Sequence, residues 1–357
     1  MMLNVSNSLK VCQVICSDIS GCSHYRLRWN SLYLTSFIER TGILPILLDQ
    51  PILDESYLRR TGSFVFQRPN KNTLSMLSRL KGAQAKFGYK IVFELDDINW
   101  DVPDYNISSL TMDQRGIFDS WRDVLPYCDR VITSTEHLKK RIERDFDCHC
   151  VTVVPNAVPR FLWNQHRDKL THSISKPKLI YTGAPQHYRN PEPISRNNLL
   201  GVSARKGDWS DEWIEFILIN VIKDKIDLTV FGGFPYFFEG IRDRVKYIPW
   251  VDCNSFPNAV MMEHADFSIS PLAENEFNRC KSNLKLLEAS AMGIPFIGTR
   301  FKDGPYEFCK TDLKDFWSYC EPDAYNSIVE WQDRFMEQTG GYIESEKHMN
   351  KLLEALS

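Results

Sequence analysis

The chain has 357 residues, of which 43% are hydrophobic and 25% are charged, and its formal net charge is −3. This composition is typical of a globular protein with about two domains, and it excludes a strongly basic protein that binds nucleic acid through its overall charge. No apolar run approaches the ~20 residues of a membrane-spanning helix, and no basic-then-apolar signal peptide opens the chain. We therefore expect a cytoplasmic protein with no membrane partner.

The first half of the chain alternates predicted strands with predicted helices. Apolar runs predict strands at 9–17, 43–48, 63–67, 90–95, 129–135 and 150–154, and helical spacing predicts helices at 27–40, 74–87, 118–127 and 136–144. The first strand leads through a turn with one glycine, Gly21, into a helix, which is how nucleotide-binding folds open. A single glycine is far weaker than the GxGxxG pattern, so it predicts no dinucleotide site.

Two adjacent carboxylates, Asp96 and Asp97, follow the predicted strand at 90–95. Ligands of open α/β sheets bind at the carboxyl ends of the strands, so these side chains are well placed for chemistry. Either one can act as a general base on an acceptor hydroxyl or orient a sugar hydroxyl. The alternative is that Asp97 or Asp101 caps a turn or a helix.

The second half repeats the same alternation after a polar, irregular linker at 159–177. Strands are predicted at 178–182, 228–231, 245–250, 266–272 and 295–299, and helices at 210–223, 256–264, 283–292, 306–317, 324–335 and 344–356, with an exposed loop at 191–208. We expect an N-terminal domain at 1–165, a second domain at 166–322 and C-terminal helices at 323–357.

The loop and helix at 278–292 carry the most informative side chains. Asn278, Arg279, Lys281 and Ser282 lie at the helix start, and Lys281, Lys285 and Glu288 follow one another at i, i+4 and i+7, on one helix face. A cationic helix N-terminus suits a phosphate, and a carboxylate two turns further on suits a ribose diol. The alternative is a solvated face with an ordinary Lys–Glu pair.

Ten cysteines without a secretion signal indicate a reducing compartment. The only cluster that suggests a metal is Cys148, His149 and Cys150. No CxxC pair and no quartet of metal ligands accompanies it. We therefore interpret these thiols as surface or structural groups and predict no metal site.

The string FNRCKSNLKLLEASAMGIPFIGT, at 277–299, resembles the C-terminal signature of nucleotide-sugar glycosyltransferases of the GT-B type, as in glycosyltransferase families 1 and 4. This resemblance implies an α/β fold of two Rossmann-like domains that face a central cleft, with a C-terminal helix that crosses back to the first domain. It also implies that Glu288 binds the donor ribose and that Lys281 and Lys285, beside Ser282, bind the diphosphate. One departure is Cys280, which stands where many retaining members have a second Glu, and this puts a retaining mechanism in doubt.

Other segments extend the resemblance. The string GAPQHYRN, at 183–190, is similar to the turn that contacts the donor diphosphate, which implies donor-binding roles for Gly183, His187 and Arg189. The alternative is a surface loop. The family also carries an acidic pair in a string like the one at 91–103, which supports catalytic roles for Asp96 and Asp97.

The family's first loop faces the interdomain cleft. The resemblance therefore implies that Ser23 and Arg26 contact the acceptor or the sugar, and that His24 lies near the chemistry. The alternative is that His24 merely caps the first helix or packs against it.

The resemblance implies transfer of a hexose or pentose from a nucleotide-sugar, most simply a UDP-sugar. A metal is not required if side chains neutralise the diphosphate, and Mg²⁺ is the other way to do so. Phage DNA glucosyltransferases share this layout, so we hypothesise a hydroxymethylcytosine acceptor in phage DNA, with double-stranded modified DNA as the partner. The alternatives are a polysaccharide, glycan or protein acceptor, and a non-catalytic binding module.

A DNA acceptor predicts a basic cleft rim around Arg26, Arg28 and 196–206, and an apolar or acidic rim counts against DNA. The sequence indicates neither the sugar, nor the stereochemistry, nor the oligomeric state.

Overall fold

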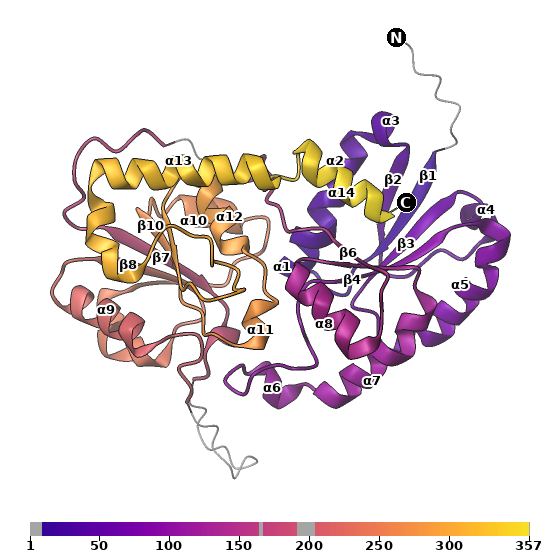
Figure 1. Ribbon diagram of the computed structural model, residues 1–357, viewed down its shortest axis with the longest axis horizontal. Coiled ribbons are helices and arrows are strands. Elements are labelled where there is room, and N and C mark those ends of the chain that lie inside the picture. Colours follow the sequence, from indigo (N-terminus) through magenta and orange to yellow (C-terminus); the bar gives the residue numbers. More distant parts are fainter. Residues whose placement is uncertain (1–8, 164–166, 191–203, 357) are drawn as a thin grey trace.

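The structure is a computed structural model that describes residues 9–163, 167–190 and 204–356, and it consists of two lobes (Figure 1). Each lobe contains one parallel sheet with helices packed against it. The last strand of the first sheet ends at Val153 and the first strand of the second sheet begins at Lys178. The α/β architecture predicted from the sequence is therefore confirmed.

The N-terminal lobe is built on a six-stranded sheet in the order β2-β1-β3-β4-β5-β6, with all neighbours parallel. The strands are β1 (Lys10–Ile15), β2 (Ile43–Leu48), β3 (Thr61–Gln67), β4 (Lys90–Leu95), β5 (Arg130–Thr133) and β6 (Val151–Val153). The α-helices are α1 (Gly21–Ser23), α2 (Trp29–Ser36), α3 (Ile38–Thr41), α4 (Glu55–Leu58), α5 (Leu74–Phe87), α6 (Ser108–Thr111), α7 (Gln114–Val124) and α8 (Glu136–Phe146). A strand that is covered on both faces has a continuous apolar sequence. In β4, the adjacent residues Val92 and Phe93 belong to two separate buried clusters, one on each face of the sheet.

The first helix departs from regular geometry. Between α1 and α2 the chain makes a five-residue π turn (His24–Arg28). Such turns are rare inside α-helices and are frequent at functional sites. This one buries Tyr25 and Arg26, and both side chains contribute to the region between the lobes.

The C-terminal lobe is built on a five-stranded parallel sheet in the order β11-β10-β7-β8-β9. The strands are β7 (Lys178–Gly183), β8 (Asp227–Gly232), β9 (Lys246–Pro249), β10 (Phe267–Ser270) and β11 (Phe296–Gly298). The helices are α9 (Asp211–Ile222), α10 (Phe256–Met261), α11 (Glu276–Arg279), α12 (Leu284–Ala291), α13 (Pro322–Thr339) and α14 (Glu346–Leu356). Leu179 packs on the α9 side of the sheet, and Ile180 packs with residues of α10 and α12.

Both sheets have a point at which the strand order reverses. In the N-terminal sheet β1 lies between β2 and β3, and in the C-terminal sheet β7 lies between β8 and β10. Chain segments that leave such neighbouring strands run to opposite faces, which leaves a crevice at the carboxyl ends of the strands. The segments after β1, β3, β4, β7, β9 and β10, together with the last residue of β8, line a common space between the lobes.

The C-terminal helices cross from one lobe to the other (Figure 1). On the C-terminal lobe, the Gln332 side chain of α13 donates to the Ile294 carbonyl at 2.8 Å and accepts from the Phe296 amide at 2.8 Å. On the N-terminal lobe, Leu352 and Leu356 of α14 pack in the cluster of β1 and β3. The predicted C-terminal helix that returns to the first domain is thus confirmed.

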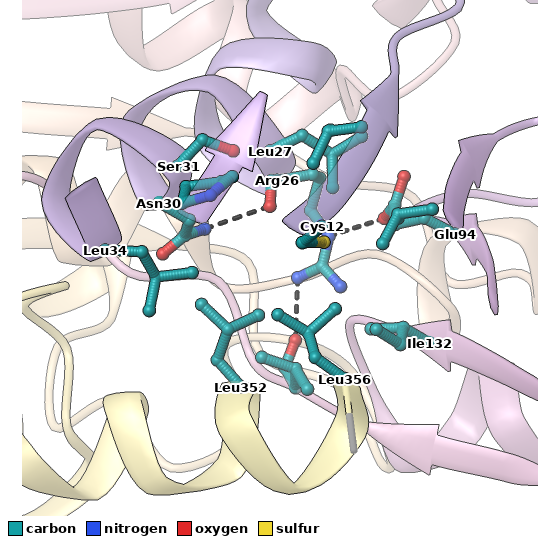
Figure 2. A pocket seen from close by; sticks show the side chains of 14 residues that line it. Cys12, Arg26, Leu27, Asn30, Ser31, Leu34, Glu94, Ile132, Leu352 and Leu356 are labelled. Atoms are coloured by element: carbon teal, nitrogen blue, oxygen red, sulfur yellow. Dashed lines mark hydrogen bonds and ion pairs between the residues drawn. The ribbon is translucent and has the colours of Figure 1, made fainter. Parts of the chain in front are cut away.

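Figure 2 shows where α14 meets the N-terminal lobe, at a cavity of about 20 Å³. Leu352 and Leu356 lie on one side of the cavity, and Arg26 and Glu94 lie on the other. A cavity of this volume has room for about one water molecule. The C-terminal helix therefore closes the N-terminal core directly over the Arg26 side chain.

Two chain segments connect the lobes side by side. The Val158 amide donates to the Gly341 carbonyl at 2.9 Å, and the Ile343 amide donates to the Val158 carbonyl at 3.1 Å. The segment from β6 and the segment between α13 and α14 are thus paired as a short parallel bridge at Val158 and Tyr342.

One predicted element is wrong. The helix expected at 306–317 is instead a turn region followed by a 3₁₀ helix (Leu313–Cys320). The Asp312 side chain accepts from the Lys314 amide, and the helix begins at Leu313, seven residues later than predicted. Before it, the Thr311 hydroxyl donates to the Phe296 carbonyl at 2.6 Å and ties the chain to β11. Among the described helices, none is both long and apolar enough to cross a bilayer.

Candidate active site

A cavity of about 720 Å³ lies between the lobes, at the carboxyl ends of both sheets. This volume is in the range of small-molecule sites. The predicted site residues that line it are Arg26, Asp96, Asp97, His187, Lys281, Ser282, Lys285 and Glu288. The predicted residues that are not among its described walls are Ser23, His24, Gly183 and Arg189.

Glu288 lies on α12 with its side chain directed at the first lobe. It is 4% exposed, and its Oε1 accepts a hydrogen bond from the Tyr25 hydroxyl at 2.6 Å. Its Oε2 lies 3.3 Å from Lys285 Nζ. Each carboxylate oxygen has two lone pairs, so both oxygens keep capacity for hydroxyl donors from a ligand. Tyr25 was not predicted from the sequence.

Lys281 stands before α12 and faces the N-terminal lobe across the cavity. Its Nζ lies 3.4 Å from Asp97 Oδ2 and 4.6 Å from the centre of the Phe277 ring. Burial alone would lower the pKa of Lys281, but the carboxylates of Asp97 and Asp208 raise it above its ordinary value. The side chain is therefore a cation at neutral pH.

Asp96 and Asp97 have different surroundings although they are adjacent. Arg68 lies 2.6 Å from Asp96 and, against the opposing effect of burial, holds the pKa of Asp96 below its ordinary value. Burial raises the pKa of Asp97, although Lys281 opposes this shift. Neighbouring carboxylates whose pKa values move apart can take separate roles. Asp97 is the better placed of the two to exchange a proton.

Arg26 lines the cavity, but its guanidinium is held inside the N-terminal lobe. It is 5% exposed and lies 2.6 Å from Glu94 (Figure 2), and it donates to the Val154 carbonyl at 2.6 Å and to Asn156 at 2.8 Å. Asn156 in turn donates to the Ser282 hydroxyl at 2.7 Å. Arg26 thus fixes an amide that reaches the second lobe.

Ser23 and His24 make local contacts at the start of the first helix. The Ser23 hydroxyl donates to the Ser20 carbonyl at 3.1 Å. His24 Nδ1 lies 2.9 Å from the same carbonyl, and its ring meets Trp29 edge-on at 5.4 Å. The structure therefore does not bring these two side chains to the described cavity wall.

Of the three predicted residues at the end of β7 and in the turn after it, His187 lines the cavity, and Gly183 and Arg189 are not among its described walls. Gly183 accepts a backbone hydrogen bond from Gly233 at 3.0 Å. Arg189 is 6% exposed and donates to the Asp104 carbonyl of the other lobe at 2.7 Å. His187 lines the cavity, and its Nδ1 lies 2.7 Å from Asp208 Oδ2.

Asp208 corrects one prediction. The segment 191–208 was expected to be an exposed loop, and residues 191–203 lie outside the described residues, but Asp208 is only 3% exposed. Its carboxylate accepts hydrogen bonds from both lobes. The available signal was the pair Trp209 and Trp213, whose helical spacing indicates that the core begins directly after Asp208.

Trp250 forms an apolar wall of the cavity. Its side chain remains 58% exposed and lies nearly parallel to the Phe256 ring, at 6.1 Å between centroids and 20° between planes. A flat, accessible ring of this kind offers a stacking surface to a planar ligand.

Of the rim expected at Arg26, Arg28 and 196–206, residues 196–203 lie outside the described residues, and the described cations are already engaged. Arg28 donates to the Ser23 hydroxyl and to the Asp18 carbonyl, Arg205 lies 3.9 Å from Asp104, and Lys206 pairs with Asp211. Apolar side chains such as Ile98, Val102 and Met112 line the N-terminal half of the cavity. Over the described residues, the rim is therefore not the basic one that a DNA acceptor predicts.

No group of three or more His, Cys, Asp and Glu side chains suited to a metal ion is found in the described parts of the chain. The cationic side chains that face the cavity from the C-terminal lobe are Lys281 and Lys285.

Comparison with known proteins extends to the fold. No model of a known protein family and no curated protein sequence matches the chain. Among solved structures, a glycosyltransferase from Rickettsia africae covers 98% of this chain and 97% of its own, with a TM-score of 0.59 and 11% identity. A sucrose-phosphate synthase from Thermosynechococcus elongatus covers 97% of this chain and 94% of its own, with a TM-score of 0.52 and 13% identity. At these identities the likeness is one of fold.

Proposed function

We propose that this chain, which has the GT-B fold of two Rossmann-like domains facing a cleft, is a glycosyltransferase that uses a nucleotide-sugar donor. The observation that carries the proposal is the arrangement of Lys281, Lys285 and Glu288 on one face at the start of α12, inside the interdomain cavity. Two cations followed by a buried carboxylate match a diphosphate followed by a ribose diol. A UDP-sugar is the first donor to test.

The C-terminal half of the cavity would hold the donor. Lys281 and Lys285 would neutralise the leaving diphosphate, and the unused amides of the first turn of α12 add partial positive charge. Glu288 would accept hydrogen bonds from the ribose, and Trp250 would stack on the base. Stabilising the charge that develops on the leaving group is the largest single contribution to such a reaction.

The N-terminal half would supply the acceptor and the base. Asp97 faces the C-terminal lobe through Lys281, and its raised pKa suits a group that takes a proton from an acceptor hydroxyl. Asp96 would hold Arg68 and shape the wall. The position of the family's second Glu is Cys280, a fully buried thiol, so no carboxylate enters the cavity there.

The acceptor is proposed from the cavity wall. Apolar side chains with the polar groups of Asn99, Asn106 and Ser108 line the N-terminal half. Such a wall suits an uncharged carbohydrate or other alcohol better than a polyanion, because the described cations near the rim are already paired. Hydroxymethylcytosine in DNA, the acceptor hypothesised from the sequence, is therefore placed second.

The test is a donor and acceptor panel. Purified protein is incubated with UDP-, GDP- and ADP-sugars, with and without Mg²⁺, and with neutral glycans, simple alcohols or hydroxymethylcytosine-containing DNA. Release of free nucleotide that depends on one donor and rises with one acceptor is expected. Tight nucleotide binding without release would favour a binding module, and neither binding nor release by any nucleotide would overturn the proposal.

A further inference from the structure

We infer that Asp208 is a positioning residue that holds His187 in one tautomer toward the donor and, through Tyr105, also stabilises closure of the two lobes. The inference rests on the proposed function for the identity of the ligand, but not for the geometry. It starts from the four hydrogen bonds that converge on one buried carboxylate.

The Asp208 carboxylate is saturated with donors. Oδ2 accepts from His187 Nδ1 at 2.7 Å. Oδ1 accepts from the Asn278 amide group at 2.6 Å, from the Ala273 backbone amide at 3.1 Å and from the Tyr105 hydroxyl at 2.7 Å. Burial would raise the pKa of Asp208, but His187, Lys281 and the hydrogen bonds hold it below its ordinary value. A carboxylate with this set of donors stays ionised.

An ionised carboxylate only accepts hydrogen bonds, so the proton between the two groups belongs to His187 Nδ1. The other ring nitrogen, Nε2, has no hydrogen-bond partner among the described residues, and His187 lines the cavity. In this tautomer the unprotonated Nε2 is a hydrogen-bond acceptor that faces the cavity. His187 would then accept a hydrogen bond from a hydroxyl of the donor sugar in a fixed direction, beside Lys281.

The fourth donor comes from the opposite lobe. Tyr105 lies on the segment between β4 and α6, nine residues after Asp96, and its hydroxyl also accepts from Asn275 at 3.2 Å and from Asn278 at 3.1 Å. Separation of the lobes would break the Tyr105–Asp208 hydrogen bond and the Asp97–Lys281 ion pair together. The His187–Asp208 pair lies within one lobe and would survive.

Gly207 shows that the close approach of these segments is built into the chain. Its φ is +65°, a left-handed conformation that favours glycine. A Cβ at this position would lie 2.3 Å from the His187 carbonyl oxygen and 2.8 Å from the Tyr105 ring. Any side chain would therefore push Tyr105 and His187 away from Asp208.

The experiment combines a direct measurement on His187 with kinetics. Protein labelled with ¹⁵N-histidine is studied by NMR as wild type, Asp208→Asn, Tyr105→Phe and the control Glu276→Gln. Glu276 pairs with His137 at 2.9 Å across the same two lobes but away from the cavity. The Glu276→Gln substitution therefore removes a similar contact between the lobes without changing the hydrogen bonds of Asp208.

We expect protonated Nδ1 on His187 in the wild type and a change of tautomer in Asp208→Asn. The value of kcat should fall about 10–100-fold in this variant. Tyr105→Phe should keep the tautomer and lower kcat about 5–50-fold, because a buried acceptor loses one partner. Glu276→Gln should change neither.

Unprotonated Nδ1 in the wild type, or the same tautomer in Asp208→Asn, would overturn the inference. These NMR results do not depend on turnover, so they separate the failure of this inference from the failure of the proposed function, which is judged by nucleotide binding. Equal kcat values for Tyr105→Phe and wild type would overturn the link to closure.

Discussion

The two halves of the cavity hold their charged side chains in different ways. In the C-terminal half, Lys281, Lys285 and Glu288 come from one turn and one helix, and they make contacts along that helix and across the cleft. In the N-terminal half, Asp96 and Arg26 are paired inside their own lobe, with Arg68 and Glu94. In the C-terminal half a helix thus presents charged side chains to the cavity. In the N-terminal half the charged side chains belong to loops that internal ion pairs stabilise.

This contrast assigns the two halves different tasks. Side chains on a short stretch of helix keep their relative positions when the lobes separate, so under the proposed function the C-terminal half would bind a nucleotide in either state. Asp97 meets Lys281 only when the lobes are together. Binding should therefore depend on the C-terminal half, and chemistry should depend on the N-terminal half and on closure.

The strongest test of the contrast is Asp97→Asn. Loss of the proposed base should lower kcat by about 10²–10⁴-fold while nucleotide affinity changes little. Nucleotide release and calorimetric titration with UDP measure the two effects separately. Asp101→Asn is the matched control, because Asp101 is 57% exposed, pairs with Arg141 and does not line the cavity. An equal loss of affinity in Asp97→Asn would contradict the division of tasks.

Lys281→Met should act on the other half. Removal of a charged hydrogen-bond donor to phosphate costs about 1.5–3 kcal/mol, so the Kd for UDP should rise about 10–150-fold. Lys310→Met, at an exposed lysine outside the cavity, should leave the Kd unchanged. If both variants bind UDP as the wild type does, the donor half has been placed wrongly.

A pH experiment sharpens the contrast at the back of the N-terminal half. His348 on α14 is 2% exposed and donates to Asn30 at 2.8 Å, and burial, followed by the charges of Arg26 and Lys351, lowers its pKa to about 3. Its folded pKa is therefore below the unfolded value of 6.5. As the pH falls below that value the unfolded chain takes up a proton that the folded chain does not, so stability is lost toward low pH at up to about 1.4 kcal/mol per pH unit.

The buried Glu94 beside Arg26 has the opposite effect on the pH dependence of stability, because burial raises its pKa and the folded chain then takes up a proton before the unfolded chain does. The measurement is therefore the difference in urea unfolding between wild type and His348→Gln at about pH 7 and about pH 5. The wild type should lose more stability than the variant on acidification. An equal loss in both would show that His348 does not titrate as a buried neutral group.

The smallest expected effect is that of Tyr25→Phe. It removes the hydroxyl that crosses the cleft to Glu288 and leaves a buried oxygen with one donor fewer, which costs about 1–3 kcal/mol. Stability should fall by this amount, and the Kd for UDP should change by less than it does in Lys281→Met. A fall in kcat as large as that of Asp97→Asn would contradict the assignment of binding to one half of the cavity and chemistry to the other.

Regular elements were predictable from local pattern. The strands at 43–48 and 90–95 and the helix at 74–87 have the predicted ends, because uninterrupted apolar or helical spacing is bounded by glycine or charged residues. The helix that carries Lys285 and Glu288 was predicted for the same reason. The side chains that α12 and the turn before it present to the cavity could therefore be predicted from one short string.

The N-terminal half could not be predicted in the same way, because its geometry depends on distant partners. Tyr25 and Glu288 are 263 positions apart in the chain, and nothing local marks the pair. Arg189 was predicted to reach a phosphate, but its long side chain extends to the Asp104 carbonyl. The roles of Gly183, Ser23 and His24 also remain predictions. Asp208 was hidden in a polar run whose burial comes from tertiary packing.

The paired connection between the lobes limits how they move. A single flexible tether lets two bodies rotate about three axes, whereas two adjacent tethers, here joined at Val158 and Tyr342, leave one easy axis that runs through them. In Figure 1 the crossing from α13 to α14 lies at the top, and α6 and α11 lie toward the bottom of the molecule. An opening about this axis would be a single rotation with its largest displacement at the far side, where Tyr105 and Asp208 meet. A rotation about one axis has a single return path, so the same contacts would reform each time the lobes close.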